Sequence, residues 1–540
     1  MSESTLSQVG TDETARADMR ASANGGINRR IVPGAEWETL YAQLRRTVPE
    51  AFDGDGQPLN LAEGEWAQPG DPKPFSSPCD GTLLCSYPML DHDAARLAVQ
   101  FAAREHSAWS KTDLDERRAR VTDCVSQLKE HRELLAYLLV WEIGKPYSQS
   151  LVSVDRCISG VEWYVEQIEG MMTGRTPLGL ISNIASWNYP LSVLMHAVLI
   201  QVLAGNAVIA KTPTDGGLCT LTLAFGIARR CGLPVSLLSG SGSVLSEALV
   251  RDAQVSCLAF VGGRSSGRDI AAGLVDQEGR YMMEMEGINA YGIWEFSDWE
   301  ELAKQTKKGF EYGKQRCTAY TRFVVQRRLF PRFLATYLPV LNSIRFGHPL
   351  LTTDGQDEPP ALAFGPLINS RSADDVRELY EEALNQGAIS IFEGEPDESL
   401  FFSGQDRSAY VAPAALLNVP RNCALYHREP FGPLDSIVVV DRIEELISEM
   451  NVSNGSLVAS IGCDDPTTAQ RIAGELRTFK VGINKVRSRG DREEPFGGIG
   501  ESWKGCFVGG EYVVRAVTQG EPNEQLYGNF PEYTLVPEKR

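Results

Sequence analysis

The sequence has little of what marks metal proteins and disulfide-bonded secreted proteins. Its 11 cysteines contain no CxxC pair, and none stands at metal-ligand spacing from any of the six histidines. We therefore predict no metal site. An odd number of cysteines scattered over 540 residues is typical of reduced thiols. This favours a reducing compartment, and we expect a cytoplasmic protein.

We also expect no targeting signal and no membrane-spanning segment. Residues 1–30 are polar and partly acidic, which is typical of a disordered tail and not of a signal or transit peptide. The longest apolar stretch, Leu191 to Ala210, is long enough to cross a bilayer. It contains His196 and Asn206, however, and Gly205 divides it into a helix and a strand. We expect a soluble protein that does not bind membranes.

Positive charge is in short supply. The 52 lysines and arginines are outnumbered by 71 acidic residues, which gives a net charge of −19. A field of this sign repels nucleic acids, so a nucleic-acid partner is disfavoured, whereas a small anion held by a local basic cluster is not excluded. A chain of 540 residues is too long for one ordinary core, so two or three domains are expected.

Short apolar strands alternate with helical patterns from Leu178 onward. Such alternation predicts a parallel sheet with right-handed crossovers, and hence an α/β fold of the Rossmann type. Glycines at two strand–helix junctions, Gly240-Ser-Gly242 and Gly262-Gly263, lie where these sheets bind phosphates. Neither completes a GxGxxG motif, and tight turns explain them equally well. The predicted strands are Leu178–Ile184, Asn206–Lys211, Val235–Leu238, Cys257–Val261 and Arg280–Glu284.

This pattern divides the chain into four parts. They are the tail at 1–30, an N-terminal segment with a cofactor-binding domain at 31–285, an α/β catalytic domain at 286–487, and a return segment with a tail at 488–540. Within the last part, Glu511 to Thr518 predicts a strand that could add to the sheet of a partner subunit. The main predicted helices are Asp91–Trp109, Asp113–Ile143 (ending at Gly144), Ser150–Ile168 and Trp299–Gln315.

The segment Phe310 to Arg322, FEYGKQRCTAYTR, places Cys317 among small, polar and basic residues. A thiolate is the reactive form of cysteine, and the neighbouring Lys314 and Arg316 would help it to form. The alternative is an inert or buried thiol, which is the usual state of one cysteine among 11. The catalytic interpretation depends on motifs elsewhere in the chain.

Six motifs occur in one order along the chain. They are SWNYP at 186–190, a lysine ending the next strand, EMEGINA at 284–290, KQRC at 314–317, EPFGP at 429–433 and PFGG at 495–498. In order and spacing they resemble the NAD(P)-dependent aldehyde dehydrogenase superfamily from about residue 75 to residue 520. Further details are similar to its glutamate-semialdehyde (pyrroline-5-carboxylate) branch, namely FEYGKQRCTA with Tyr312, Asn289-Ala290, Ile483-Asn484 and GGEYVVRA at 509–516. The resemblance implies a Rossmann-type cofactor domain, an α/β catalytic domain and a small C-terminal oligomerisation strand.

The resemblance also implies a role for each matching catalytic residue. Cys317 matches the nucleophile, whose thiolate would attack the aldehyde carbon to give a thiohemiacetal and then a thioester. The Asn188 side-chain amide and the Cys317 backbone N–H would hold the oxyanion, and Glu284 would activate the hydrolytic water. Without the family, Asn188 is a helix cap and Glu284 a solvated acid at a strand end.

The implied cofactor is NAD or NADP. Lys211 matches the lysine that binds the adenosine ribose and Glu429 the glutamate that binds the nicotinamide ribose, and each is otherwise a surface charge. Thr214 stands where members that prefer NAD carry a glutamate, so a 2′-phosphate is not repelled and NADP is slightly favoured. Asp215 could partly restore a preference for NAD. The predicted cofactor-binding residues are Ile184, Ser186, Trp187, Lys211, Thr214, Gly242, Phe260, Gly262, Gly263, Glu429 and Phe431.

The aldehyde itself is predicted less closely. Small and basic residues are expected in the loop at 505–510, where this chain has Phe507 and Val508. An aromatic or aliphatic aldehyde is therefore an alternative to a semialdehyde such as glutamate semialdehyde. Arg316 could pair with a substrate carboxylate, or equally face the surface or the cofactor. The predicted substrate-binding residues are Arg316, Thr318, Phe507 and Val508.

Several departures from the family pattern keep other interpretations open. Glu286, Ile288 and Lys314 would place bulky or charged groups near the nicotinamide and the nucleophile, so a non-catalytic binding or structural protein is one alternative. A coenzyme-A-acylating dehydrogenase is another, although such enzymes lack the glutamate that Glu284 matches. Residues 170–177 leave no room for the β-arm that many relatives pair across their dimer interface. A homodimer is still the predicted assembly.

Overall fold

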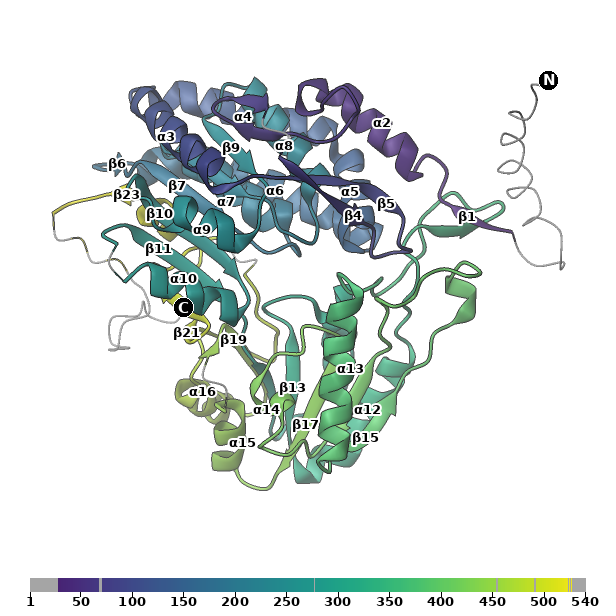
Figure 1. Ribbon diagram of the computed structural model, residues 1–540. Helices are drawn as coiled ribbons and strands as arrows, with labels where there is room; N and C mark the ends of the chain where they lie inside the picture. The colour runs from purple at the N-terminus through teal and green to yellow at the C-terminus, as the bar shows by residue number, and fades with distance from the viewer. Residues whose placement is uncertain are drawn as a thin grey trace, which may run out of the picture.

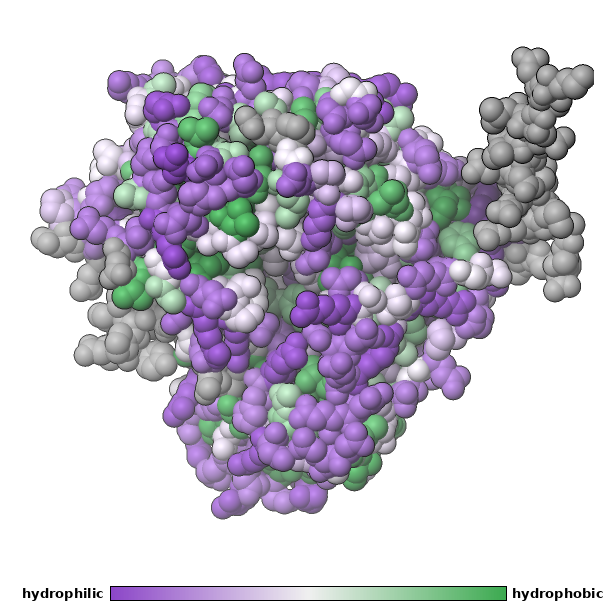
Figure 2. All heavy atoms as spheres, viewed as in Figure 1, coloured by the Kyte–Doolittle hydropathy of each residue, from purple (hydrophilic) through white to green (hydrophobic). Residues whose placement is uncertain are grey.

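The computed structural model describes residues 28 to 526, except 68–69, 276, 453–454, 490–491, 523 and 525. Two large β-sheets dominate it, one in the upper part and one in the lower part of Figure 1. The face shown in Figure 2 is mostly hydrophilic, and it is hollowed where the two parts meet. Strands of both sheets end at this junction. Because parallel α/β sheets bind ligands at such strand ends, we expect the functional site there.

The first sheet has a core of five parallel strands in the order β11-β10-β7-β8-β9. Every residue of β8 and β9 is buried, as strands covered on both faces require. The prediction of a Rossmann-type parallel sheet is confirmed. The strands are β7 (Leu180–Ile184), β8 (Ala207–Lys211), β9 (Val235–Leu238), β10 (Val255–Gly262) and β11 (Arg280–Met285).

Helices cover both faces of this sheet because its strands are apolar on both sides. In β8, Ala207 and Ile209 pack with α3 and α9, whereas Val208 and Ala210 pack with α7 and α8. The helices around this sheet are α2 (Trp37–Thr47), α3 (His92–Trp109), α4 (Leu114–Glu130), α5 (Arg132–Ile143), α6 (Tyr147–Met171), α7 (His196–Leu203), α8 (Leu218–Arg230), α9 (Gly242–Val250) and α10 (Arg264–Gly273).

Two helix predictions can be compared closely with the structure. The single helix expected over 113–143 is wrong, because the chain breaks at His131 into α4 and α5. The predicted stop is right, since Gly144 ends α5 with a left-handed φ of 66°. The apolar run after Pro190 divides as predicted into helical turns and β8, and no helix in the described part of the chain is long and apolar enough to span a membrane.

The second sheet has seven strands in the order β15-β16-β17-β13-β12-β19-β20, and all neighbouring pairs except β15–β16 are parallel. Its strands are β12 (Asn289–Ile293), β13 (Tyr320–Gln326), β15 (Ile389–Glu393), β16 (Ala414–Leu417), β17 (Leu434–Val440), β19 (Val458–Gly462) and β20 (Lys480–Ile483). Its helices are α11 (Trp299–Gly309), α12 (Phe330–Asn342), α13 (Ser370–Asn385), α14 (Ala424–His427), α15 (Ile443–Met450) and α16 (Pro466–Glu475).

The segments before and after the two sheets tie them together. β22 (Trp503–Gly505) returns from the second sheet and pairs antiparallel with β11. At the opposite edge of the first sheet, β2 (Asn60–Ala62) pairs with β9 and with β3 (Glu65–Ala67). Two short pairs complete this part of the chain: β4 (Asp71–Ser76) with β5 (Leu83–Met89), and β18 (Gly455–Ser456) with β21 (Ile499–Gly500).

The structure corrects two predictions about the chain ends. Of the expected disordered tail, residues 1–27 lie outside the described residues, but β1 (Arg29–Ile31) is ordered and pairs with β14 (Leu351–Thr353). The predicted strand Glu511–Thr518 is wrong, because α17 (Tyr512–Ala516) occupies it. The two-residue β23 (Thr518–Gln519) then pairs with β6 (Thr176–Pro177) of the same chain. The segment that was predicted to pair with a partner subunit therefore pairs with a strand of its own chain.

Candidate active site

A tight turn precedes Cys317. The helix predicted to reach Gln315 ends at Gly309, and Tyr312, Gly313 and Lys314 then adopt left-handed φ angles of 59°, 60° and 59°. Non-glycine residues rarely adopt this conformation, at a cost of roughly 1–2 kcal/mol each, so surrounding contacts must hold the turn. The Gln315 side chain supplies several: Nε2 donates to the carbonyls of Tyr312 and Pro366, both at 3.2 Å, and Oε1 accepts from the Ile368 N–H at 3.0 Å.

Lys314 is turned away from the nucleophile. Its Nζ lies 2.6 Å from Asp435 Oδ1 and donates to the Tyr320 carbonyl at 2.8 Å. The Tyr337 hydroxyl donates to the other Asp435 oxygen at 2.7 Å. The expectation that this lysine charges the vicinity of Cys317 is therefore wrong, because its charge is neutralised in a buried ion pair.

Cys317 instead meets a carboxylate. Its Sγ donates to Glu284 Oε1 at 2.8 Å, and Glu284 is only 2% exposed near the end of β11. Burial first, and then the Glu284 charge, raise the pKa of the Cys317 thiol well above its ordinary value. The thiol is thus protonated at rest, with an acceptor for its proton already in contact. The alternative of a solvated acid at Glu284 is wrong.

Glu284 has a second partner that the sequence did not indicate. Arg489 Nη1 donates to Glu284 Oε2 at 2.6 Å. Arg489 belongs to the loop after β20 and lies 205 positions from Glu284 in sequence, inside no motif. Neither local composition nor spacing signals such a contact.

Asn188 lies in the turn between β7 and the helical turns that follow, and is 4% exposed. Its Nδ2 donates to the Gln315 carbonyl at 2.9 Å, and its Oδ1 accepts from the Ser186 hydroxyl at 2.5 Å. Asn188 therefore sits beside the Cys317 turn, with one N–H of its amide engaged there. It does not cap the following helical segment, so that alternative is wrong.

A buried lysine supports this arrangement. Lys145 is 2% exposed, and its Nζ donates to the Asn188 carbonyl at 2.8 Å and to Ser153 Oγ at 3.2 Å. The Lys145 Nζ also lies 4.0 Å from the ring centre of Tyr189 and 4.4 Å from that of Tyr312. Burial lowers the pKa of Lys145 well below its ordinary value. From the sequence, Gly144-Lys145-Pro146 indicated only a helix end, so this role was missed.

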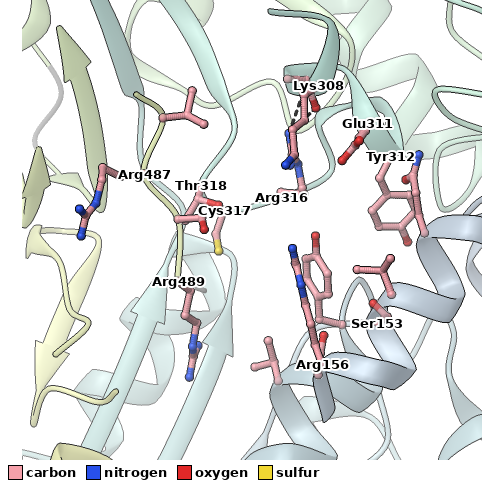
Figure 3. A pocket seen from close by; sticks show the side chains of 18 of the residues that line it. Ser153, Arg156, Lys308, Glu311, Tyr312, Arg316, Cys317, Thr318, Arg487 and Arg489 are labelled. Atoms are coloured by element: carbon pink, nitrogen blue, oxygen red, sulfur yellow. Dashed lines mark hydrogen bonds between the residues drawn. The ribbon is translucent and has the colours of Figure 1, made fainter. Parts of the chain in front are cut away.

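A cavity of about 690 Å³ opens in front of Cys317. Figure 3 shows Arg156 rising from α6 on one side of this space, with Cys317 and Thr318 on the other. The Arg316 guanidinium donates to the Gly309 carbonyl at 2.7 Å, while its buried Nε has no partner among the described residues. Thr318 and Arg316 thus line the cavity. Among the described residues, its basic and acidic lining consists of Lys145, Arg156, Lys308, Glu311, Lys314, Arg316, Arg487, Arg489 and Arg492.

The two apolar residues predicted to bind substrate lie elsewhere. Phe507 is 1% exposed, and its ring centre lies 4.7 Å from that of Phe479 and 6.2 Å from that of Trp503. It fills the core and does not line the large cavity, which corrects the prediction. Val508 lines a smaller adjoining cavity of about 50 Å³ together with Glu284.

The predicted cofactor residues of the first sheet gather at its carboxyl edge. Ile184 pairs in register with Lys211 on one side and with Phe260 on the other, so three strands end together. The glycines stand where the chain leaves this edge for a helix: Gly242 begins α9, and Gly262 and Gly263 lead into α10. This is the edge where parallel α/β sheets bind ligands.

Lys211 is buried at this edge, and its Nζ donates to the Thr212 carbonyl at 2.9 Å. Burial lowers the pKa of its ammonium to about 8, against the pull of Asp215. Thr214 follows the strand and donates its hydroxyl to Asp215 Oδ2 at 3.4 Å. No carboxylate therefore takes the position of Thr214 itself, and Asp215 lies beside it.

Residues of the second part complete this edge. Glu429 is 3% exposed; its Oε2 accepts from the Gly287 N–H at 3.3 Å, and its buried Oε1 has no partner within the described residues. Burial first, then Glu286, raises the pKa of Glu429 well above its ordinary value. The rings of Phe431 and Trp187 meet edge to face at 5.9 Å and join the two parts.

This donor set fits a dinucleotide in all but one feature. An orphaned buried oxygen on Glu429 suits a ligand hydroxyl, and the glycine junctions admit a phosphate. Glu286 is the misfit, because its carboxylate lies 3.7 Å from where a Cβ on Gly263 would stand. The departure predicted near the nicotinamide therefore adjoins the Gly262-Gly263 turn. Ile288 is buried at 3% exposure.

The family model described as the aldehyde dehydrogenase family matches residues 66–521. The chain belongs to the aldehyde dehydrogenase family. Similar relatives include the 3,6-anhydro-α-L-galactose dehydrogenase of a Vibrio species, 25% identical over 489 residues that cover 87% of this chain and 98% of that protein. The NADP-dependent succinate-semialdehyde dehydrogenase of Escherichia coli is 25% identical over 465 residues, covering 82% of this chain and 93% of that protein.

Solved structures of aldehyde dehydrogenases are also similar to this chain over most of its length. One is the NADP-dependent glyceraldehyde-3-phosphate dehydrogenase of Bacillus halodurans complexed with NADP, with a TM-score of 0.77 at 25% identity over 86% of this chain and 98% of that chain. The betaine aldehyde dehydrogenase of Staphylococcus aureus in complex with NAD+ has a TM-score of 0.78 at 21% identity, over 91% of this chain and 100% of that chain, and shows the fold alone. The predicted superfamily, fold and enzyme class are confirmed. The glutamate-semialdehyde branch stays a prediction.

Proposed function

We propose that this aldehyde dehydrogenase oxidises an aldehyde to a carboxylate with NAD or NADP, through a thioester on Cys317 that water hydrolyses. The observation that carries the proposal is the contact of 2.8 Å between the Cys317 thiol and the Glu284 carboxylate. A nucleophile in contact with a buried base is what covalent catalysis followed by hydrolysis requires. Glu284 also argues against the coenzyme-A-acylating alternative.

The first half of the reaction uses the thiol proton. Glu284 Oε1 accepts it, and the Cys317 sulfur forms a bond to the aldehyde carbon. The carbonyl oxygen becomes an oxyanion, to which the second N–H of the Asn188 amide can donate, since the first is held by Gln315. A bound nicotinamide supplies the acceptor for the hydride that leaves the thiohemiacetal carbon, and a thioester on Cys317 remains.

In the second half, Glu284 gives its proton to solvent and acts again as a base. It takes a proton from a water molecule whose oxygen attacks the thioester carbon, and the carbon–sulfur bond breaks to return Cys317. One aldehyde, one oxidised cofactor and one water thus yield a carboxylate, a reduced cofactor and two protons. The raised pKa of the Cys317 thiol means that the sulfur is readily reprotonated afterwards.

The cofactor would lie along the carboxyl edge of the first sheet. Lys211 and Thr214 would face the adenosine ribose, Gly242 and Gly263 the diphosphate, and Glu429 the nicotinamide ribose. The absence of a carboxylate at Thr214 supports a preference for NADP, which Asp215 weakens. A homodimer and a cytoplasmic location stay predictions from the sequence.

The substrate is proposed to carry a second, anionic group. In a chain of net charge −19, the described lining of the cavity contains several arginines and a single carboxylate, Glu311. Arg156 is exposed there and makes no ion pair or hydrogen bond within the described residues. A guanidinium of this kind binds a carboxylate or phosphate through two parallel hydrogen bonds. Because Phe507 points into the core, the apolar loop no longer favours an aromatic aldehyde.

Turnover by the purified protein tests the proposal. Formation of reduced nicotinamide is followed with NAD and NADP separately, on glutamate semialdehyde, succinate semialdehyde, an aliphatic aldehyde and benzaldehyde, without coenzyme A. We expect activity that the C317A variant loses and that is highest on the anionic aldehydes. No turnover with any aldehyde, despite measurable cofactor binding, would support the non-catalytic alternative, and turnover only with coenzyme A present the acylating one.

Charge variants in the cavity test the substrate class. Arg156→Gln should raise KM for an anionic aldehyde by about tenfold or more while leaving kcat and the KM for a neutral aldehyde nearly unchanged, since it removes ground-state binding alone. Glu311→Gln is the control of opposite sign and should lower KM for the anion. Equal effects of both variants on anionic and neutral aldehydes would contradict an anion site.

A further inference from the structure

We propose that Arg489 is a positioning residue for the general base: it holds the Glu284 carboxylate against the Cys317 thiol and so sets the pH at which the thiol gives up its proton. The inference rests on the proposed function, because it assigns Glu284 the role of base. Arg489 would touch neither the reacting carbon nor the sulfur, and would act through Glu284.

Both oxygens of Glu284 are engaged from opposite sides. Oε1 accepts from Cys317 Sγ at 2.8 Å and Oε2 accepts from Arg489 Nη1 at 2.6 Å. Glu284 is 2% exposed, whereas the Arg489 side chain is 29% exposed. A buried carboxylate held at both oxygens cannot rotate without breaking one contact, and a charge-assisted bond to a guanidinium is the stronger restraint.

Arg489 lies between two cavities, next to the groups that the proposed reaction uses. Cys317 lines the large cavity and Glu284 the small one, and Arg489 lines both. The small cavity, at about 50 Å³, is large enough for a water molecule next to Glu284. Glu284 therefore faces the thiol, the guanidinium and a space of the size that hydrolysis needs. In Figure 3 the Arg489 side chain extends away from Arg316, so it is not grouped with that arginine.

The other titratable groups around this pair leave Arg489 as the cation in contact with Glu284. Tyr164 of α6 and His196 of α7 both feel the Arg489 charge, but burial keeps each neutral near pH 7, with the pKa of His196 lowered to about 3. The cation opposes burial and Glu284 by lowering the pKa of the Cys317 thiol. Among the described residues, Glu429 lies near Cys317 and Arg492 near His196, and burial raises the pKa of Glu429 well above its ordinary value.

Removing Arg489 should therefore change the pH at which the Cys317 thiol ionises. Without the cation, the state with ionised Glu284 and a thiolate loses an attraction, so the S–H bond of Cys317 breaks only at higher pH. For Arg489→Gln we expect the alkaline shift in Cys317 ionisation to be at least about one unit, which is about a tenfold slower thiol reaction at pH 7. Arg489→Lys keeps the positive charge but loses the planar guanidinium, so it should shift the ionisation of Cys317 less than Arg489→Gln does.

Alkylation by iodoacetamide provides a test that needs no aldehyde. The modification rate of the Cys317 peptide is measured by mass spectrometry from about pH 6 to pH 10 in the full-length wild type, R489Q and R489K, with C317A identifying the peptide. R492Q is the matched control for alkylation alone, because iodoacetamide is neutral: it removes one positive charge nearby, but Arg492 donates to Ser159 and not to Glu284. The pH profile of kcat/KM on the best aldehyde is measured in parallel.

The inference holds if R489Q shifts both profiles to higher pH while the alkylation profile of R492Q follows that of the wild type. It is overturned if the R489Q alkylation profile coincides with that of the wild type, or if R489Q raises only KM, which would make Arg489 a substrate ligand. Should thermal melting show that R489Q is unfolded, R489K decides, because a smaller shift in the same direction supports the inference and none overturns it. Absent turnover by the wild type would count against the proposed function and leave the alkylation result to judge Arg489.

Discussion

At the scale of single residues, Cys317 shows how far local composition can mislead. The basic residues before it suggest a thiolate stabilised by adjacent cations. In the structure, Lys314 pairs with Asp435, Arg316 donates to the carbonyl end of α11, and the group in contact with the thiol is a carboxylate. The cysteine is therefore a protonated thiol in contact with a carboxylate, and in the proposed mechanism its reactivity depends on proton transfer to Glu284.

Substitution of the base follows from this. Glu284→Gln should reduce steady-state turnover by about 10² to 10⁴, because glutamine cannot accept a proton from water. At alkaline pH, where the thiol ionises to solvent, a burst of one reduced cofactor per active site should remain. Stopped-flow measurement of reduced nicotinamide separates the two phases. Loss of burst and turnover together at every pH would contradict the assignment of Glu284 as the hydrolytic base, because acylation would then fail even where the thiol ionises without Glu284.

Thr214 offers a second prediction at this scale. Thr214→Glu should raise KM for NADP at least about tenfold relative to KM for NAD, because a carboxylate at this position would repel a 2′-phosphate. Thr214→Gln is the neutral control of the same size and should leave the ratio near that of the wild type. Steady-state kinetics with both cofactors provides the comparison. An unchanged ratio in Thr214→Glu would place the adenosine ribose elsewhere.

At the scale of structural elements, the turn before Cys317 is held by a buried ion pair. Lys314 and Asp435 have side-chain exposures of 1% and 0%, and they join the left-handed turn after α11 to the start of β17. Desolvation makes such a pair a weak source of net stability, yet removal of one partner leaves a buried charge alone. The departure of Lys314 from the family pattern thus ties the turn before Cys317 to β17.

Lys314→Met should accordingly lower the free energy of unfolding by about 3–5 kcal/mol, because Asp435 loses its counter-ion. The double variant Lys314→Met, Asp435→Asn should recover much of this loss. Urea denaturation followed by circular dichroism gives the comparison. If the double variant is no more stable than Lys314→Met alone, the pair is not coupled as the geometry indicates.

At the scale of the whole molecule, the cavity lining is rich in basic residues although the chain as a whole is acidic. The chain carries −19 overall, yet cations line the cavity and face the reacting groups. Burial acts on titratable groups across the same region, and His196 in α7 is the clearest case. It packs against Tyr164 with ring centres 5.8 Å apart, and burial lowers its pKa to about 3.

This histidine predicts acid sensitivity of the fold. The unfolded chain binds a proton at His196 below about pH 6.5, while the folded chain does so only near pH 3. Its contribution to stability is complete above the unfolded pKa and is lost as pH falls from about 6.5 toward 3, which amounts to roughly 3 kcal/mol between pH 7 and pH 4. Urea midpoints should fall less steeply over this range in His196→Gln than in the wild type. The exposed His92→Gln serves as control, and identical slopes in all three proteins would contradict the prediction.

Much of this enzyme follows from sequence alone, because strand and helix patterns and motif order are local. Apolar strands such as Ala207–Lys211 alternate with helices and predict the parallel sheet, and the order of motifs around Asn188, Glu284 and Cys317 indicates the family. Helix ends were harder where no proline or glycine marks them: α4 and α5 part at His131, and the turn at Tyr312 is helical in composition but left-handed in fact.

Only the tertiary structure decided which charges meet. Lys314 and Asp435 are 121 positions apart, and Glu284 and Arg489 are 205 apart, so no local pattern records either pairing. Phe507 likewise fills the core near Phe479 because packing and not composition determines where a large ring goes. The free energy of a charge or a ring depends on its burial and partners, and those exist only after folding brings distant strands to one edge.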